Sequence, residues 1–89
     1  MMATVEDLTL YQYEGCAWCA MVHRAAATLG VEIAQRDIFQ EPEHLRDLVA
    51  ATGRQTVPCL RFERGGEEQW MHESGEIIAY LNERFASSR

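Results

Sequence analysis

The sequence predicts an α/β fold in which a four-stranded mixed sheet is flanked by helices, with the elements in the order β-α-β-α-β-β-α. Stretches that alternate apolar and polar residues, which is typical of strands, are interleaved with stretches whose apolar residues recur at helical spacing. Gly65-Gly66 lies between the last two strand-like stretches and is a hairpin signal. With 89 residues, 47% of them hydrophobic, the chain can build one modest core and is too short for two. We therefore expect residues 1–89 to form a single domain.

The first half of the chain has the pattern of a parallel βαβ unit followed by a second helix. The predicted elements are a strand over Leu8–Tyr13, a helix over Ala17–Leu29, a strand over Val31–Ile38, and a helix that begins near Pro42 and ends at Gly53. Gly30 supplies the stop of the first helix, because glycine adopts the left-handed conformation that often follows a helix. Pro42 is a favoured first-turn residue.

The second half predicts a β-hairpin and a final helix. Strands are expected over Val57–Phe62 and Glu67–Met71, joined by Arg64-Gly65-Gly66 and therefore antiparallel. Ser74 is a good N-cap, and the apolar residues that follow it predict a helix to about Arg84.

Composition narrows the function classes. The net charge is −6, and all eight basic residues are arginines. A chain without a cationic surface is a poor candidate for binding nucleic acid or anionic lipid. No apolar run is long enough to cross a bilayer. Met1–Leu10 does not resemble a secretory signal, because it contains the acidic pair Glu6-Asp7 and lacks a basic segment followed by a long apolar stretch. We therefore expect a cytoplasmic protein that binds neither nucleic acid nor membranes.

The chemistry is expected at Cys16-Ala17-Trp18-Cys19, in the turn between the first strand and the first helix. Backbone N–H groups and the helix dipole at this position favour a thiolate over a thiol. Cys16, which follows Gly15 in a turn expected to be exposed, should attack, and Cys19 should resolve. Two alternatives compete: a zinc site completed by Cys59 with His72 or His23, and cysteines that are simply buried. We expect no metal site. Our preferred interpretation of Cys59 is a small buried residue of a strand.

Three motifs in this order resemble the glutaredoxins of the thioredoxin superfamily: CxxC at Cys16–Cys19, Thr56-Val57-Pro58, and Glu73-Ser74 at the start of the last helix. The resemblance extends over Leu8–Phe85 and implies a thioredoxin-like fold. The Glu73-Ser74 motif also resembles that of the glutathione transferase N-terminal domain, which shares this fold.

The resemblance implies a glutathione-binding site. In the family, the proline that matches Pro58 is cis, and the backbone of the residue that matches Val57 pairs with the cysteinyl part of glutathione. Glu73 and Ser74 match the positions that hold the γ-glutamyl end. The remaining candidates are Arg54 or Arg36 for the glycine carboxylate, Gln55 as a hydrogen-bonding neighbour, Trp18 as a stacking face, and Tyr13, which stands where many relatives have lysine.

The function that the resemblance implies is a glutathione-dependent thiol-disulfide oxidoreductase that reduces glutathione mixed disulfides and protein disulfides, with glutathione as cosubstrate. Its partners would be disulfide-containing or glutathionylated proteins, and we expect a monomer. One alternative is a carrier that holds an iron–sulfur cluster between two protomers, which we do not favour. Another is a thioredoxin-like electron donor reduced by a flavoprotein reductase. Glu14 stands where many relatives have proline, and the sequence leaves open whether it contacts or repels glutathione.

Overall fold

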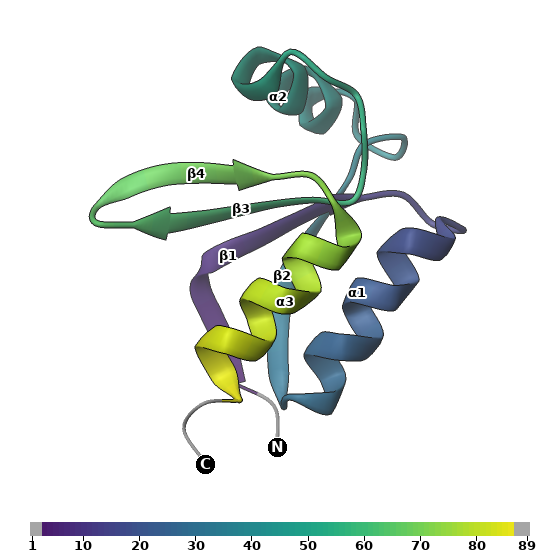
Figure 1. The fold of residues 1–89 in the computed structure, drawn as a ribbon. Helices are drawn as coiled ribbons and strands as arrows, with labels where there is room; N and C mark the ends of the chain where they lie inside the picture. The colour runs from purple at the N-terminus through teal and green to yellow at the C-terminus, as the bar shows by residue number, and fades with distance from the viewer. Residues whose placement is uncertain (1–2, 87–89) are drawn as a thin grey trace.

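The computed structural model describes residues 3–86 as one mixed sheet with helices on both faces (Figure 1). The elements are β1 (Ala3–Gln12), α1 (Ala17–Thr28), β2 (Val31–Asp37), α2 (Pro42–Thr52), β3 (Cys59–Arg64), β4 (Glu67–Met71) and α3 (Ser74–Phe85). The sheet has four strands in the order β2-β1-β3-β4. β1 is parallel to β2 and antiparallel to β3, and β3 is antiparallel to β4. The predicted thioredoxin-like α/β fold and its element order are confirmed.

The sheet divides the core into two parts. α1 and α3 cover one face of the sheet, whereas α2 lies on the other (Figure 1). The larger buried cluster comprises Leu8, Leu10, Val22, Ala26, Val31, Ile33, Leu60, Phe62, Ile77 and Leu81. The smaller cluster comprises Tyr11, Ile38, Leu48 and Cys59. Within residues 3–86, no helix combines the length and the apolar character that crossing a bilayer requires.

The starts of three elements differ from the prediction, and several ends differ by one or two residues. β1 begins at Ala3 and not at Leu8, because its first residues also pair with β2 before the register shifts ahead of Thr9. β3 begins at Cys59 and not at Val57, since the preceding Pro58 has no N–H to donate to a strand ladder. The N-cap of α3 is Glu73, so the prediction of Ser74 as N-cap is wrong by one position.

Candidate functional site

Cys16 occupies the N-cap position of α1. Its Sγ atom accepts a hydrogen bond from the backbone N–H of Cys19 at 3.2 Å, and its own N–H donates to the carbonyl of Tyr13 at 3.2 Å. The residue is only 7% exposed, so the prediction of an exposed Cys16 is wrong. The sulfur folds back over the first turn, where it satisfies an otherwise unpaired helix N–H. The geometry therefore fixes the Cys16 sulfur at the positive end of the helix.

Cys19 lies one turn further along α1 and is 1% exposed. Burial, together with the interaction of its side chain with that of Cys16, raises the pKa of Cys19 to about 12. Its thiol is therefore protonated at neutral pH. Cys19 is therefore the less reactive of the two sulfurs in the motif, and the roles of Cys16 as attacker and Cys19 as resolver stay predictions.

A pocket of about 250 Å³ surrounds the cis peptide bond between Val57 and Pro58, which agrees with the expectation drawn from the resemblance. Its lining residues are Trp18, Thr56, Val57, Pro58, His72, Glu73 and Ser74. The structure thus gathers many of the predicted glutathione-binding residues from three separate segments: the start of α1, the loop before β3, and the start of α3. Because α3 begins at Ser74, its unpaired N–H groups make this end of the pocket suited to a carboxylate.

Arg54 and Arg36, the two cations predicted for the glycine carboxylate of glutathione, lie in different surroundings. Arg54 is exposed and lines a shallow depression together with His72, which also borders the cis-proline pocket. Arg36 instead donates from Nη1 to the Tyr11 hydroxyl at 3.0 Å and lies 4.0 Å from an oxygen of Asp47 on α2. Arg54 is therefore the better placed of the two for the glycine carboxylate. Gln55 is exposed beside it.

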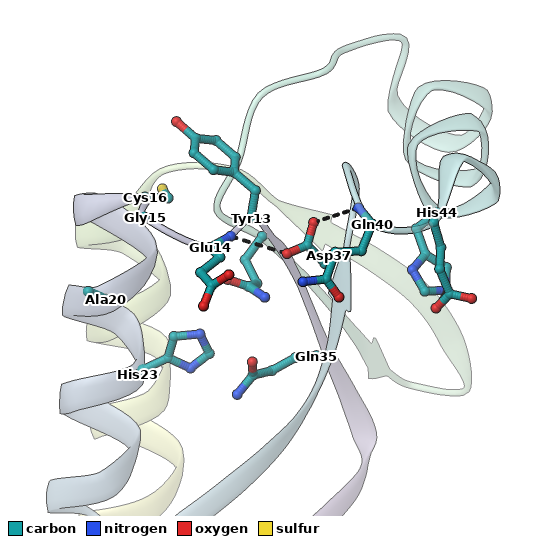
Figure 2. Close-up of a pocket in the computed structure, with 12 residues that line it drawn as sticks. Tyr13, Glu14, Gly15, Cys16, Ala20, His23, Gln35, Asp37, Gln40 and His44 are labelled. Atoms are coloured by element: carbon teal, nitrogen blue, oxygen red, sulfur yellow. Dashed lines mark hydrogen bonds and ion pairs between the residues drawn. The ribbon is translucent and has the colours of Figure 1, made fainter.

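A larger pocket, of about 470 Å³, opens between α1, β2 and the loop before α2 (Figure 2). Cys16 lines this pocket, as does Tyr13, whose ring packs against Phe39 with centroids 5.0 Å apart. The structure thus places Tyr13 in this pocket, whereas the other pocket holds the cis-proline. Sequence reasoning missed this second pocket, because its walls come from four segments with no shared motif.

The third cysteine, Cys59, lies close to one histidine, His72. Cys59 is fully buried, and burial raises its pKa to about 12. Its Sγ lies 3.9 Å from Nε2 of His72. In the part of the chain that the structure describes, no three His, Cys, Asp or Glu side chains are grouped so that they could hold a metal ion, and the zinc alternative lacks a ligand set there. Cys59 fits its interpretation as a buried strand residue.

The fold agrees with a comparison to known families. The model of the glutathione S-transferase N-terminal domain matches residues 10–89. The chain belongs to this family. The resemblance to the thioredoxin superfamily and to the glutathione transferase N-terminal domain is therefore confirmed, while membership of the glutaredoxins in particular stays a prediction.

Solved structures of glutathione transferases and related enzymes are similar to this domain over most of its length. The trimeric glutathione transferase TDR1 of Leishmania is 26% identical with a TM-score of 0.73, and the match covers 90% of this chain and 18% of that protein. Maleylacetoacetate isomerase from Anaeromyxobacter dehalogenans is 25% identical with a TM-score of 0.66, covering 90% and 36%. That isomerase has also been solved with dicarboxyethyl glutathione in its active site.

The fold extends to more distant members. Glutathione transferase Omega 2S from Trametes versicolor is 20% identical with a TM-score of 0.70, covering 91% of this chain and 37% of that protein. The chain therefore spans between about a fifth and two fifths of these structures. None of the curated proteins compared with the chain matches it.

Proposed function

We propose that this domain binds glutathione in the cis-proline pocket and uses Cys16 as the nucleophile of a glutathione-dependent thiol-disulfide oxidoreductase. The observation that carries the proposal is the position of the Cys16 sulfur at the N-terminus of α1, where it accepts the Cys19 N–H. Trp18, in the first turn of the same helix, lines the cis-proline pocket. A thiol at a helix N-terminus beside a peptide-sized pocket suits exchange with a peptide thiol.

The pocket offers complementary groups to each part of glutathione. The backbone of Val57 suits pairing with the cysteinyl residue in the manner of an added strand. The carboxylate of Glu73 suits the α-amino group, and Ser74 with the free N–H groups of α3 suits the adjoining carboxylate. Arg54 supplies a cation for the glycine carboxylate. Support also comes from the similar isomerase, which binds a glutathione derivative in its active site.

The proposed reaction has two exchanges. The Cys16 thiolate attacks the glutathione sulfur of a mixed disulfide, the S–S bond breaks, and the other thiol leaves as a thiolate that takes up a proton. Cys16 is then joined to glutathione by a disulfide bond. The thiolate of a second glutathione attacks the glutathione sulfur of this intermediate, which releases oxidised glutathione and restores the Cys16 thiolate.

Cys19 provides a second route for protein disulfides, through a Cys16–Cys19 bond. Because Cys19 is buried and its pKa is raised to about 12, it is a weak attacker at neutral pH. Glutathione itself is therefore the main group that resolves the intermediate.

Turnover of the mixed disulfide between glutathione and 2-mercaptoethanol tests the proposal, with oxidised glutathione measured through glutathione reductase and NADPH. Wild type and Cys19→Ser should both turn over, whereas Cys16→Ser should lose activity. Cys59→Ser is a matched control, because it removes a buried cysteine from outside the CxxC motif. Wild-type turnover by Cys16→Ser would overturn the assignment.

The family match favours a second candidate, in which glutathione itself attacks an electrophile bound nearby. In conjugation to 1-chloro-2,4-dinitrobenzene the glutathione thiolate displaces chloride, and the side chain at position 16 only stabilises that thiolate. Cys16→Ser keeps a hydroxyl that donates such a hydrogen bond. Retention of conjugation together with loss of disulfide exchange in Cys16→Ser would separate the two activities. The iron–sulfur and flavoprotein-reductase alternatives have no supporting observation of their own.

A further inference from the structure

The larger pocket, which Cys16 borders, is lined by acidic side chains. Three carboxylate residues, Glu14, Asp37 and Glu41, line it, and no arginine does. Among the described lining residues, the only side chains that could carry a positive charge are two histidines, His23 and His44. Burial lowers the pKa of His23, which keeps that ring neutral at pH 7. A cavity of about 470 Å³ that contains the proposed nucleophile has room for the part of a disulfide that lies beyond the glutathione half.

The three carboxylates are not equivalent. Asp37 accepts hydrogen bonds from the backbone N–H groups of Glu14 at 3.1 Å, Phe39 at 2.8 Å and Gln40 at 3.0 Å, and the bonds from the loop lower its pKa. Glu41 lies 3.8 Å from Nε2 of His44. Asp37 thus holds the two loops together, and Glu41 has a histidine neighbour.

Glu14 is the carboxylate left without a partner. Its backbone is held by Asp37, while its carboxylate makes no hydrogen bond or ion pair with any residue in the described range 3–86. Figure 2 shows the Glu14 side chain extending into the pocket, towards His23 on α1. An anchored backbone with a free carboxylate, close in sequence to Cys16, is arranged to meet a cation brought by a ligand.

We propose that Glu14 determines substrate specificity by favouring mixed disulfides whose non-glutathione half carries a positive charge. The inference rests on the proposed function. When the glutathione half of the disulfide fills the cis-proline pocket, the other half must lie outside that pocket. Cys16 borders the larger pocket, which Glu14 also lines, so the other half can lie there. Thiols with an amine or guanidinium a few bonds from the sulfur fit this position. Attack by Cys16 then releases the cationic thiol, while glutathione stays on Cys16.

Three glutathione mixed disulfides of similar size test the proposal, formed with cysteamine, 2-mercaptoethanol and 2-mercaptoethanesulfonate. At low salt, wild-type kcat/KM should be about threefold higher for the cationic than for the neutral disulfide, about 0.7 kcal/mol, and about threefold lower for the anionic one. These differences in kcat/KM among the three disulfides should shrink as salt screens the charges. Glu14→Gln should abolish them. Glu67→Gln, which removes the same charge from the exposed hairpin, should preserve them.

The outcomes separate this inference from the function on which it rests. Turnover that requires Cys16 but shows no preference among the three disulfides would overturn the role of Glu14 alone. An equal change in Glu14→Gln and Glu67→Gln would do the same, because it would assign the preference to net charge. Full turnover by Cys16→Ser would overturn the proposed function itself.

Discussion

An ion pair between the first strand and the last helix ties α3, whose first turn borders the cis-proline pocket, to the sheet. Two guanidinium nitrogens of Arg84 donate to the two carboxylate oxygens of Asp7, at 2.8 and 2.9 Å. Arg84 also donates to the Tyr80 hydroxyl at 2.8 Å. The change that tests this contact is Asp7→Asn, which keeps the shape of the side chain and removes its charge.

The expected magnitude follows from geometry and exposure. The Arg84 and Asp7 side chains are 34% and 22% exposed, so solvent screens the pair in part. Exposed ion pairs contribute about 0.2–1 kcal/mol, and the two-point geometry places this one near the upper end, at about 1 kcal/mol. For a domain of this size, a loss of about 1 kcal/mol lowers Tm by about 4–8 °C.

The pH dependence has a defined sign. The hydrogen bond from Arg84 lowers the pKa of Asp7 in the folded state, so the stabilisation is complete above the unfolded-state pKa of about 3.9. It is lost as pH falls through the folded-state pKa. The difference in Tm between wild type and Asp7→Asn should therefore be constant from about pH 7 to 5 and shrink below about pH 4.

Thermal unfolding followed by circular dichroism measures this difference. Asp47→Asn is the control, because its oxygen lies 4.0 Å from Arg36 and its side chain is 58% exposed, and it should change stability by less than about 0.3 kcal/mol. Unfolding of Asp7→Asn at the wild-type temperature at pH 7 would refute the reasoning. A difference that stays undiminished at pH 3 would refute its electrostatic origin.

Three further predictions concern the site and its supports. Glu73→Gln should raise KM for glutathione about tenfold with little change in kcat, since it would weaken the charge-assisted hydrogen bond that we propose between Glu73 and the glutathione amino group; steady-state kinetics in which kcat falls and KM stays constant would contradict this. Iodoacetamide at pH 7.5 should label Cys16 in the folded protein, and label Cys19 and Cys59 only after unfolding, because burial raises the pKa of both to about 12; mass spectrometry that finds Cys59 labelled first would contradict the packing. Gly53→Ala should destabilise the protein by about 1 kcal/mol in urea unfolding, because position 53 has a φ of 74°, and a variant as stable as wild type would contradict the assigned C-cap.

The order of the elements could be predicted because local patterns carry it. Alternation marks the strands, and Gly30, Gly53 and Gly65-Gly66 mark the turns, where all four glycines have positive φ. The start of β1 could not be predicted, because Glu6 and Asp7 resemble a loop until the pairing with β2 and the contact with Arg84 are known. Those partners lie far along the chain.

The parts of the site that a sequence motif marks could be predicted, whereas the parts that depend on tertiary packing could not. The cis-proline pocket follows from Thr56-Val57-Pro58 and Glu73-Ser74, which the fold brings together with Trp18. The low exposure of Cys16 did not follow from the turn, because it depends on the sulfur folding back towards the Cys19 N–H. The larger pocket depends on Asp37 joining two loops, and the sequence singled out three of its lining residues, Tyr13, Glu14 and Cys16, without indicating the pocket itself.

The central claim is that Cys16 becomes covalently joined to glutathione during the reaction. Cys19→Ser removes the internal resolving thiol, so the intermediate should accumulate when this variant is mixed with oxidised glutathione and quenched in acid. Intact-mass and peptide mass spectrometry should find one glutathionyl group, on Cys16, that is removed by added reduced glutathione. A glutathionyl group on Cys59, or an unmodified protein that still exchanges disulfides, would contradict the account.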